Sequence, residues 1–136
     1  MVENNEQNTK QKKRSVLIID DDKFLLDMYT LKFNELDFNV LTALSSEDAL
    51  NLLKESKPDA ILLDIVMPGM DGFEFLKKVK GEHVADDSFV IVLSNLGQES
   101  DIDKAKQIGA DGYIVKASAT PSEIVKKVVE YLEKQK

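Results

Sequence analysis

The sequence predicts an α/β fold: a doubly wound parallel sheet of five strands with five helices. Short aliphatic runs alternate with segments of helical period from Ser15 to the C-terminus, which is the pattern of repeated βα units. Several of the runs are apolar at consecutive positions, as strands covered on both faces must be. Crossovers of this length connect parallel strands with right-handed geometry, so the helices are expected on both faces of the sheet.

The expected strands span residues 16–20, 39–43, 60–64, 89–94 and 112–116. Polar residues stand at the ends of four of them. The second ends in Thr42-Ala43-Leu44, without a charged group. This is expected of an edge strand that lies away from the binding crevice of such a sheet.

Apolar spacing and capping residues place the helices between and after these strands. The first is expected to bury one stripe, which consists of Leu25, Met28, Tyr29, Phe33 and Leu36. The second begins after Ser45, with Asp48 at the capping-box position, and runs to about Ser56. The third holds Phe75, Leu76 and Val79, and the fourth spans residues 99–108, before Gly109. The last follows Thr120-Pro121-Ser122-Glu123, a capping box with proline at the first helical position.

Composition excludes several classes of function. The chain has 136 residues, no cysteine and a formal net charge of −7, so one domain is expected, without disulfides or thiolate metal sites. Acidic proteins repel nucleic acids and anionic membranes, which argues against a direct nucleic-acid or membrane partner. The chain has neither a signal peptide nor an apolar run of about 20 residues, and a cytoplasmic location is expected.

Residues 1–13 contain Val2 as their only aliphatic residue after Met1. That is too little apolar surface to offset the entropy of ordering, so a disordered polar tail is expected there. Residues 14–136 are expected to form the folded domain. Because the chain ends directly after the last helix, a stand-alone domain without an effector domain is expected.

Charged and polar residues follow four of the strands, at ends that meet at one edge of a parallel sheet. They are Asp20, Asp21 and Asp22, then Asp64, Ser94 and Lys116. Each alone has an ordinary structural explanation, such as a helix cap for Asp22. Several carboxylates at one edge, however, resist simultaneous ionisation unless a cation lies among them.

Oxygen ligands of this kind favour Mg²⁺, which binds one or two carboxylates, waters and often a phosphate oxygen. A lysine beside the ion can neutralise a phosphoryl oxygen, and a serine hydroxyl can donate to another. One of the carboxylates could then act as a nucleophile and become an acyl phosphate.

Four stretches, VLIIDDD, LLDIVMPGMDG, VIVLSN and GADGYIVK, stand in an order and spacing that resemble a response-regulator receiver domain of two-component signalling. The resemblance covers residues 14–132. It implies that Asp64 is the phosphoacceptor and that Asp20 and Asp21, with the backbone carbonyl of Val66, hold Mg²⁺. It also implies the remaining roles: a phosphate-sensing hydroxyl and amine at Ser94 and Lys116, and a switch aromatic at Tyr113.

The resemblance further implies a flavodoxin-like fold with sheet order 2-1-3-4-5. The phosphoryl group would come from a phosphohistidine on a sensor histidine kinase or a histidine phosphotransfer protein. Phosphorylation would switch a surface around the fourth helix, fifth strand and fifth helix, read by an unidentified protein target. The chain would be a monomer or a phosphorylation-dependent dimer. It would not be an enzyme, apart from catalysing its own phosphorylation and dephosphorylation.

The chain departs from the family pattern at two positions. Ala117 stands where the family usually has proline joined by a cis bond, and we predict a trans Lys116–Ala117 peptide, since a non-proline cis bond costs about 2.5–4 kcal/mol. Asn95 stands where a small residue is usual, and we hypothesise that its amide alters the lifetime of the acyl phosphate. His83 is expected to be a solvated loop residue, and Met67 and Met70 to pack within their loop.

Three alternatives stand beside this interpretation. A haloacid-dehalogenase-type phosphatase would use Asp20-Asp21-Asp22 as its Asp-x-Asp. This alternative leaves Asp64 without a role, and this chain lacks the further acidic pair that such a phosphatase needs after its lysine, here Lys116. A receiver-like scaffold that never carries phosphate is compatible with Ala117 and Asn95. Flavin binding fits poorly, because no phosphate-binding loop follows the first strand.

Overall fold

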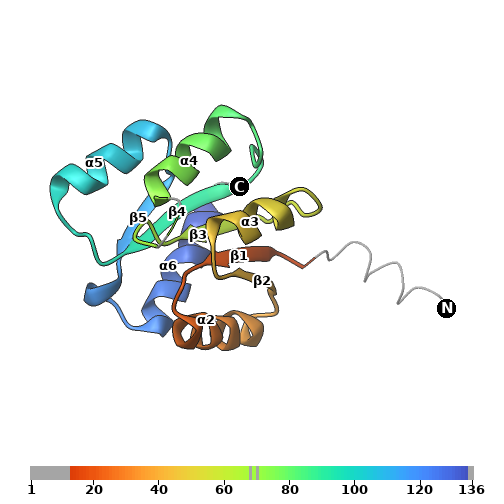
Figure 1. Cartoon of the computed structure of the whole chain (residues 1–136). Helices are drawn as coiled ribbons and strands as arrows, with labels where there is room; N and C mark the ends of the chain where they lie inside the picture. The colour runs from red at the N-terminus through yellow and green to blue at the C-terminus, as the bar shows by residue number, and fades with distance from the viewer. Residues whose placement is uncertain (1–12, 68, 70, 135–136) are drawn as a thin grey trace.

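The computed structural model describes residues 13–67, 69 and 71–134. Strands and helices alternate along the chain (Figure 1), and η1 is a single 3₁₀ turn. Their bounds are β1 Ser15–Ile19, α2 Lys23–Glu35, β2 Asn39–Ala43, α3 Ser46–Leu53, β3 Ala60–Leu63, α4 Gly72–Gly81, β4 Phe89–Ser94, α5 Glu99–Ile108, β5 Gly112–Val115, η1 Lys116–Ser118 and α6 Pro121–Lys134. The tail predicted to be disordered lies outside the described residues, except for Lys13.

The five strands pair in parallel in the order β2-β1-β3-β4-β5, which confirms the predicted fold class and topology. The order reverses between β1 and β3, so the crevice of the sheet opens where these two strands end. β2 is an edge strand, as predicted. Each strand agrees with its predicted span to within one residue at either end.

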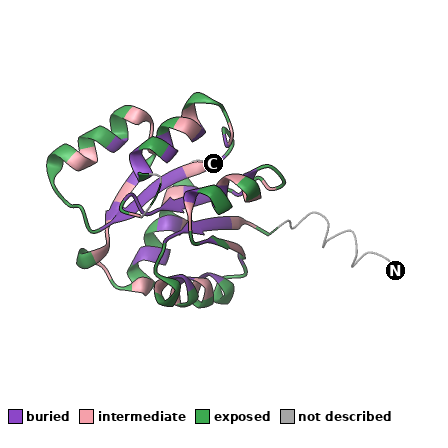
Figure 2. Cartoon of the chain, in the orientation of Figure 1, coloured by how far each residue is buried: buried purple, intermediate pink, exposed green. Residues whose placement is uncertain are grey.

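Helices cover both faces of the sheet, with buried residues beneath them (Figures 1 and 2), and the core forms two apolar layers, one on each face. Successive side chains of a strand point to opposite faces. Leu17 and Ile19 of β1 therefore join the layer beneath α3 and α4, whereas Val16 and Ile18 join the layer beneath α2 and α6. β1 and β3 are buried almost throughout. Their ends are consequently held rigidly, which fixes the residues that follow them.

The predicted helix starts are confirmed by their caps. The Asp22 carboxylate accepts hydrogen bonds from the N–H groups of Phe24 and Leu25, and the Ser45 hydroxyl accepts from the N–H of Asp48. Thr120 and Glu123 form the reciprocal pair of a capping box. Gly109 ends α5 with a φ of 123°, a conformation that favours glycine.

Two expectations about the helices are wrong. Leu36, predicted to be buried, is 52% exposed, and Met28 is only partly buried. Leu26, which was not predicted, belongs to the buried stripe instead. The reason is that α2 ends at Glu35, and its buried side is centred on Leu26, Tyr29 and Phe33. The second error concerns α3, which ends at Leu53 rather than near Ser56 because the next two N–H groups bond to carbonyls only three residues back.

Candidate functional site

The ends of β1 and β3 hold two aspartates in fixed backbone positions. The N–H of Asp20 donates to the carbonyl of Ala43 over 3.1 Å, and the N–H of Asp64 donates to the carbonyl of Ile19 over 3.0 Å. The interstrand hydrogen bonding therefore continues one residue past each strand. The two side chains emerge next to each other at the crevice.

Both carboxylates are buried and oriented by their own loops. The side chains of Asp20 and Asp64 are only 2% and 8% exposed. One oxygen of each accepts the N–H two residues further along: Asp22 for Asp20 at 2.9 Å and Val66 for Asp64 at 3.0 Å. This leaves the second oxygen of each carboxylate to face the crevice.

Lys116 joins these two second oxygens. Its Nζ lies 2.6 Å from Oδ2 of Asp20 and 3.0 Å from Oδ2 of Asp64, and its side chain is 11% exposed. The lysine reaches the crevice from η1, directly after β5, across the width of β4 and β3. Three residues that are far apart in the sequence thus form one buried ionic cluster.

Burial shifts the pKa values in this cluster. It raises the pKa of Asp64, against the opposing effects of the Val66 N–H and the Lys116 charge. Burial by itself would lower the pKa of Lys116, but its hydrogen bond to Asp20 and the charges of Asp64 and Asp20 outweigh this effect and raise it. The lysine therefore carries its positive charge at neutral pH.

Asp21 adds a third carboxylate. Asp20, Asp21 and Asp64 each offer an oxygen, and these oxygens all lie within 4.8 Å of one another. Lys116 contributes one positive charge against three carboxylates, so an excess of negative charge remains in the cluster. An all-oxygen donor set with residual negative charge fits a hard divalent cation such as Mg²⁺.

Ser94 and Tyr113 meet at a single backbone segment beside the cluster. Ser94 is fully buried, and its Oγ accepts from the N–H of Leu96 at 3.2 Å. The Tyr113 hydroxyl donates to the carbonyl of the same Leu96. Among the described residues, no hydrogen bond joins Ser94 to Asp64 or Lys116. The structure therefore brings four predicted residues into direct proximity, namely Asp20, Asp21, Asp64 and Lys116. Ser94, at the end of β4, and Tyr113, in β5, both bond to the adjoining loop at Leu96.

The structure also places the remaining predicted positions. The Val66 side chain is 54% exposed, which is compatible with a role for its backbone alone. All peptide bonds within the described part of the chain are trans, and this confirms the prediction for Lys116–Ala117. His83 is exposed in a loop, where it pairs with Asp86 at 2.9 Å, as expected. Met67 was predicted to pack within its loop, and it is partly buried against the core; Met70 lies outside the described residues.

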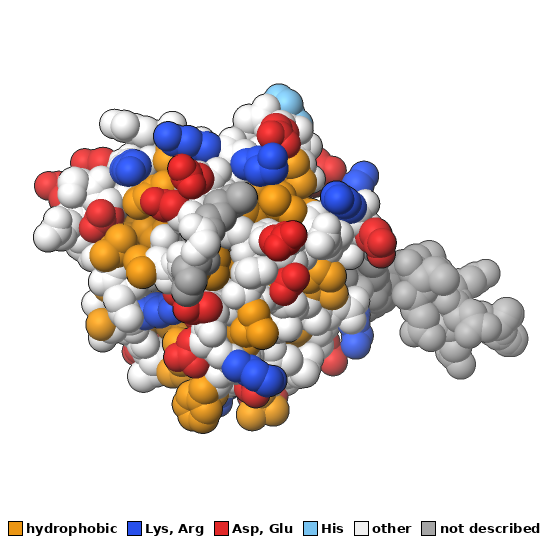
Figure 3. Space-filling view, in the orientation of Figure 1, with side chains coloured by type: hydrophobic (Ala, Val, Ile, Leu, Met, Phe, Trp, Pro, Cys, Tyr) orange, Lys and Arg blue, Asp and Glu red, His pale blue; other side chains and the backbone are white. Residues whose placement is uncertain are grey.

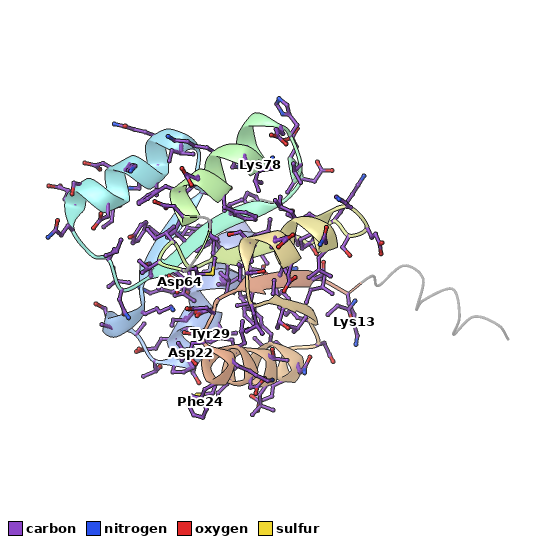
Figure 4. The ribbon with its side chains drawn as sticks, in the orientation of Figure 1. Lys13, Asp22, Phe24, Tyr29, Asp64 and Lys78 are labelled. Carbon is purple, nitrogen blue, oxygen red and sulfur yellow. The ribbon has the colours of Figure 1, made fainter. Side chains whose placement is uncertain are left out.

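Tyr29 lies closer to the site than the sequence indicated. The pattern predicted only a buried stripe residue, and Tyr29 is indeed 2% exposed. Burial raises the pKa of its hydroxyl, and the charges of Lys116, Asp20 and Asp64 all act on it. Figure 4 shows Tyr29 near Asp22 and below Asp64, on the inner side of α2. The sequence did contain a signal for this proximity: Tyr29 follows the strand-end aspartates by two helical turns.

Residues 16–129 match the family described as the response regulator receiver domain. The chain belongs to this family. Receiver domains are signalling phosphoacceptors that bind Mg²⁺ at an acidic pocket and interact with sensor kinases or phosphotransfer proteins. None of the helices in the described residues is long and apolar enough to cross a membrane.

Relatives and solved structures agree with this assignment. The chain is 36% identical over 102 residues to the transcriptional regulatory protein AfsQ1 of Streptomyces coelicolor, covering 75% of this chain and 44% of that protein. It is 33% identical over 115 residues to the phosphate regulon regulator PhoB of Escherichia coli, covering 85% and 50%. The chain spans half or less of the length of these relatives.

Among solved structures, the receiver domain of the Francisella response regulator 1452 superposes with a TM-score of 0.81 at 27% identity, over 91% of this chain and all of that one. A CheY-like receiver domain protein from Methanospirillum hungatei superposes with a TM-score of 0.82 at 25% identity, over 91% and 97%. These likenesses extend over nearly the whole described domain.

Proposed function

We propose that this receiver domain accepts a phosphoryl group from a phosphohistidine onto Asp64, with Mg²⁺ bound, and thereby switches a protein-interaction surface. The observation that supports this most directly is the Lys116 ammonium, which contacts both Asp20 and Asp64 beside a third carboxylate. Phosphoryl transfer needs mainly positioning and charge neutralisation. A buried carboxylate flanked by a cation and by metal-binding oxygens offers both.

In the proposed reaction a carboxylate oxygen of Asp64 attacks phosphorus. A P–O bond forms and the P–N bond of the phosphohistidine breaks. The electron pair of that bond passes to the imidazole nitrogen, which takes up a proton. Lys116, released from Asp64, would neutralise an oxygen of the transferred group.

Asp20, Asp21, Asp64 and the backbone carbonyl of Val66 would hold Mg²⁺. When bound, the ion would offset the negative charge of carboxylates and phosphoryl group. Asp22 is excluded from this set because its carboxylate already caps α2.

The switch would operate through the Leu96 segment. If Ser94 turns toward the phosphoryl group, its Oγ no longer accepts a hydrogen bond from the N–H of Leu96. Leu96 would then be able to shift, and Tyr113, whose hydroxyl bonds to the Leu96 carbonyl, would shift with it. Such a change would alter the surface formed by α5, β5 and α6. We propose that a protein target reads this surface.

The proposed partners are a sensor histidine kinase or a histidine phosphotransfer protein as donor, and a downstream protein as target. The acidic composition supports protein targets over direct nucleic-acid binding. We further propose that the domain acts as a stand-alone receiver, as a monomer or a phosphorylation-dependent dimer, and catalyses its own phosphorylation and dephosphorylation.

Intact-mass measurement after incubation with Mg²⁺ and acetyl phosphate tests this function. The wild type and the control Asp22→Asn are expected to gain one phosphoryl group, and Asp64→Ala is expected to gain none. If the wild type binds Mg²⁺ but gains no mass, the chain is a phosphorylation-silent scaffold. If Asp64→Ala hydrolyses phosphate esters and Asp20→Ala does not, the phosphatase alternative replaces the proposal.

A further inference from the structure

Strand β2 lies at one edge of the sheet, and within the described part of the chain it pairs with β1 alone. The N–H of Asn39 and the carbonyl of Ala43 both bond to residues that directly flank β1, so they point toward that strand. The backbone groups of successive residues point to alternate sides of a strand. Val40 and Thr42 therefore direct their N–H and C=O groups away from β1, toward the open edge of the sheet.

The edge of β2 lacks the features that usually prevent a strand from pairing with another chain, namely charged side chains, proline, a bulge or a covering element. The strand reads Asn-Val-Leu-Thr-Ala, without a charged residue or proline. Its register with β1 is continuous over its whole length, so it has no bulge. Asn39 and Thr42 are exposed, so the neighbouring helices do not cover the strand. The other edge strand, β5, belongs to the surface of the proposed function, whereas no site described above uses β2.

The apolar side chains in the middle of β2 are only partly buried, on both faces of the sheet. Leu41 packs against the layer beneath α3 and α4, and Val40 packs against the layer beneath α2 and α6. By contrast, the aliphatic residues of β1 and β3, which have a strand on either side, are buried. A further strand beside β2 would therefore extend both apolar layers and cover the remaining exposed surface of these two side chains.

The strand is self-complementary in an antiparallel register centred on Leu41, which favours a second copy of the chain as the added strand. About a twofold axis, Val40 of each copy lies opposite Thr42 of the other. Both residues direct their backbone groups outward, so each of these pairs exchanges two hydrogen bonds. Leu41 lies opposite Leu41 of the other copy in a pair without hydrogen bonds, which is the closer kind, and the two side chains can pack together. Because β2 has no charged residue, this register places no like charges opposite each other.

We infer that β2 is a self-association edge, through which two copies pair antiparallel and join their sheets. The contact uses none of the residues of the acidic cluster, so it forms without phosphorylation, and it is separate from the α5–β5–α6 surface of the proposed function.

The association is weak and depends on salt. The strand has only five residues, and each copy has a formal net charge of −7, so the copies repel each other. Figure 3 shows acidic and basic side chains interspersed over the face that it draws, rather than gathered into one patch of each sign. Salt screens a repulsion between net charges but has little effect on backbone hydrogen bonds and apolar contacts, so association strengthens as the salt concentration rises.

Sedimentation velocity from micromolar to millimolar chain concentration tests the association. The average mass of the wild type is expected to rise with concentration, and more steeply at higher salt. Thr42→Pro removes an outward N–H without removing a bond to β1, and Thr42→Lys adds a charge at the edge. Each is expected to lower the association constant at least about tenfold. The matched control Thr42→Val keeps the N–H and the branched side chain, and it is expected to associate at least as strongly as the wild type.

Circular dichroism identifies the variants that remain folded, and Thr42→Lys tests the edge if Thr42→Pro does not fold. A wild type that stays monomeric overturns the inference and leaves the edge to an extended peptide of another protein. Folded Thr42→Lys that associates like the wild type also overturns it, and so does a control that loses association.

Disulfide formation tests the register. The chain has no cysteine, so Leu41→Cys and Asn39→Cys each introduce a single thiol. Residues that lie opposite each other in a pair without hydrogen bonds have Cα atoms about 4.5 Å apart, which a disulfide can span. The two Asn39 positions would be about 13 Å apart along the strands, because each lies opposite Ala43 of the other copy.

With oxidised glutathione as the oxidant, Leu41→Cys is expected to form a covalent dimer several-fold faster than Asn39→Cys. Random collision would give the opposite order, because Asn39 is more exposed than Leu41 and an exposed thiol reacts more readily. Asn39→Cys that forms the dimer as fast as Leu41→Cys would exclude this pairing, as would the absence of a covalent dimer from Leu41→Cys.

Discussion

At the residue scale, three consecutive aspartates occupy three different environments. Asp20 is buried and bonded to Lys116, Asp21 is exposed beside the cluster, and Asp22 caps α2. The chemistry of each follows from where its carboxylate points after the strand ends. The same substitution, aspartate to asparagine, can therefore be made at neighbouring positions to compare their roles.

Asp21→Asn is expected to weaken Mg²⁺ binding at least about tenfold, since loss of supporting groups outside the ligand shell already costs 10–100-fold in other metal sites. Asp22→Asn should leave the affinity nearly unchanged, because asparagine caps helices as well as aspartate does. Isothermal titration calorimetry with MgCl₂ measures both. Equal losses in the two variants would contradict the assignment of Asp21 as a ligand.

Asn95→Ala is expected to shorten the lifetime of the phosphorylated protein several-fold. Asn95 is exposed directly after the buried Ser94, where its amide would shield the phosphoryl group from water. The decay of intact-mass signal after removal of acetyl phosphate gives the rate. An unchanged rate would remove Asn95 from the account.

The positions of the cluster residues could be predicted because these residues stand at strand ends, and a parallel sheet gathers these ends at one edge. The hydrogen bonds between their side chains could not be predicted from the sequence. Nothing in the pattern indicates that Lys116 bonds to Asp20 as well as Asp64, because this depends on the side-chain conformations that η1 imposes. Tyr29 was assigned to the core alone for a similar reason: periodicity shows that a side chain is buried, but not what its far end approaches.

At the element scale, the start of α4 packs closely against the loop that follows Asp64. A Cβ on Gly72 would lie 2.1 Å from Cα of Ile65, in the loop that follows Asp64, whereas a Cβ on Gly81 would meet nothing within 4 Å. Gly72→Ala is expected to lower the free energy of unfolding by about 3 kcal/mol and to slow phosphorylation of Asp64.

Gly81→Ala is the matched control in the same helix. It is expected to be neutral or slightly stabilising, because alanine favours helix over glycine. Urea unfolding measures both variants. If they behave alike, close packing at Ile65 does not constrain the loop.

The capping box of α6 predicts a pH dependence. Hydrogen bonds from the N–H and side chain of Thr120 lower the pKa of Glu123 below its ordinary value of 4.5. A lowered pKa means that the folded state favours the carboxylate. The stability that Glu123 adds is therefore present above its ordinary pKa and lost as the pH falls through the lowered one.

The stability of the wild type relative to Glu123→Gln should accordingly be greatest near neutral pH and decline in acid. Thermal unfolding of both proteins between neutral and acidic pH measures this difference. A difference that does not change with pH would mean that the glutamate charge adds nothing to the cap.

Helix starts were more predictable than helix ends. Ser45, Thr120 and Asp22 announce their helices because a side-chain oxygen must satisfy free N–H groups at the start. The end of α3 has no such residue, and a tighter turn closes it three residues early. The exposure of Leu36 has the same origin, since it depends on where α2 stops.

At the scale of the whole molecule, the alternation of strands and helices predicts a parallel sheet, and right-handed crossovers restrict its topology. The order β2-β1-β3-β4-β5 was not readable from alternation alone; it came from the resemblance to receiver domains. The order matters because it places β1 beside β3. Only then do Asp20 and Asp64 become neighbours that one lysine can reach.

The proposed phosphoacceptor is Asp64, and no other carboxylate of the cluster is expected to carry the phosphoryl group. Borohydride reduces an acyl phosphate to an alcohol, so it converts a phosphorylated aspartate into homoserine, which peptide mass spectrometry can locate. After incubation with Mg²⁺ and acetyl phosphate, homoserine is expected at position 64 alone. Homoserine at position 20, 21 or 22, or a phosphorylated protein in which no aspartate is reduced, would contradict the account.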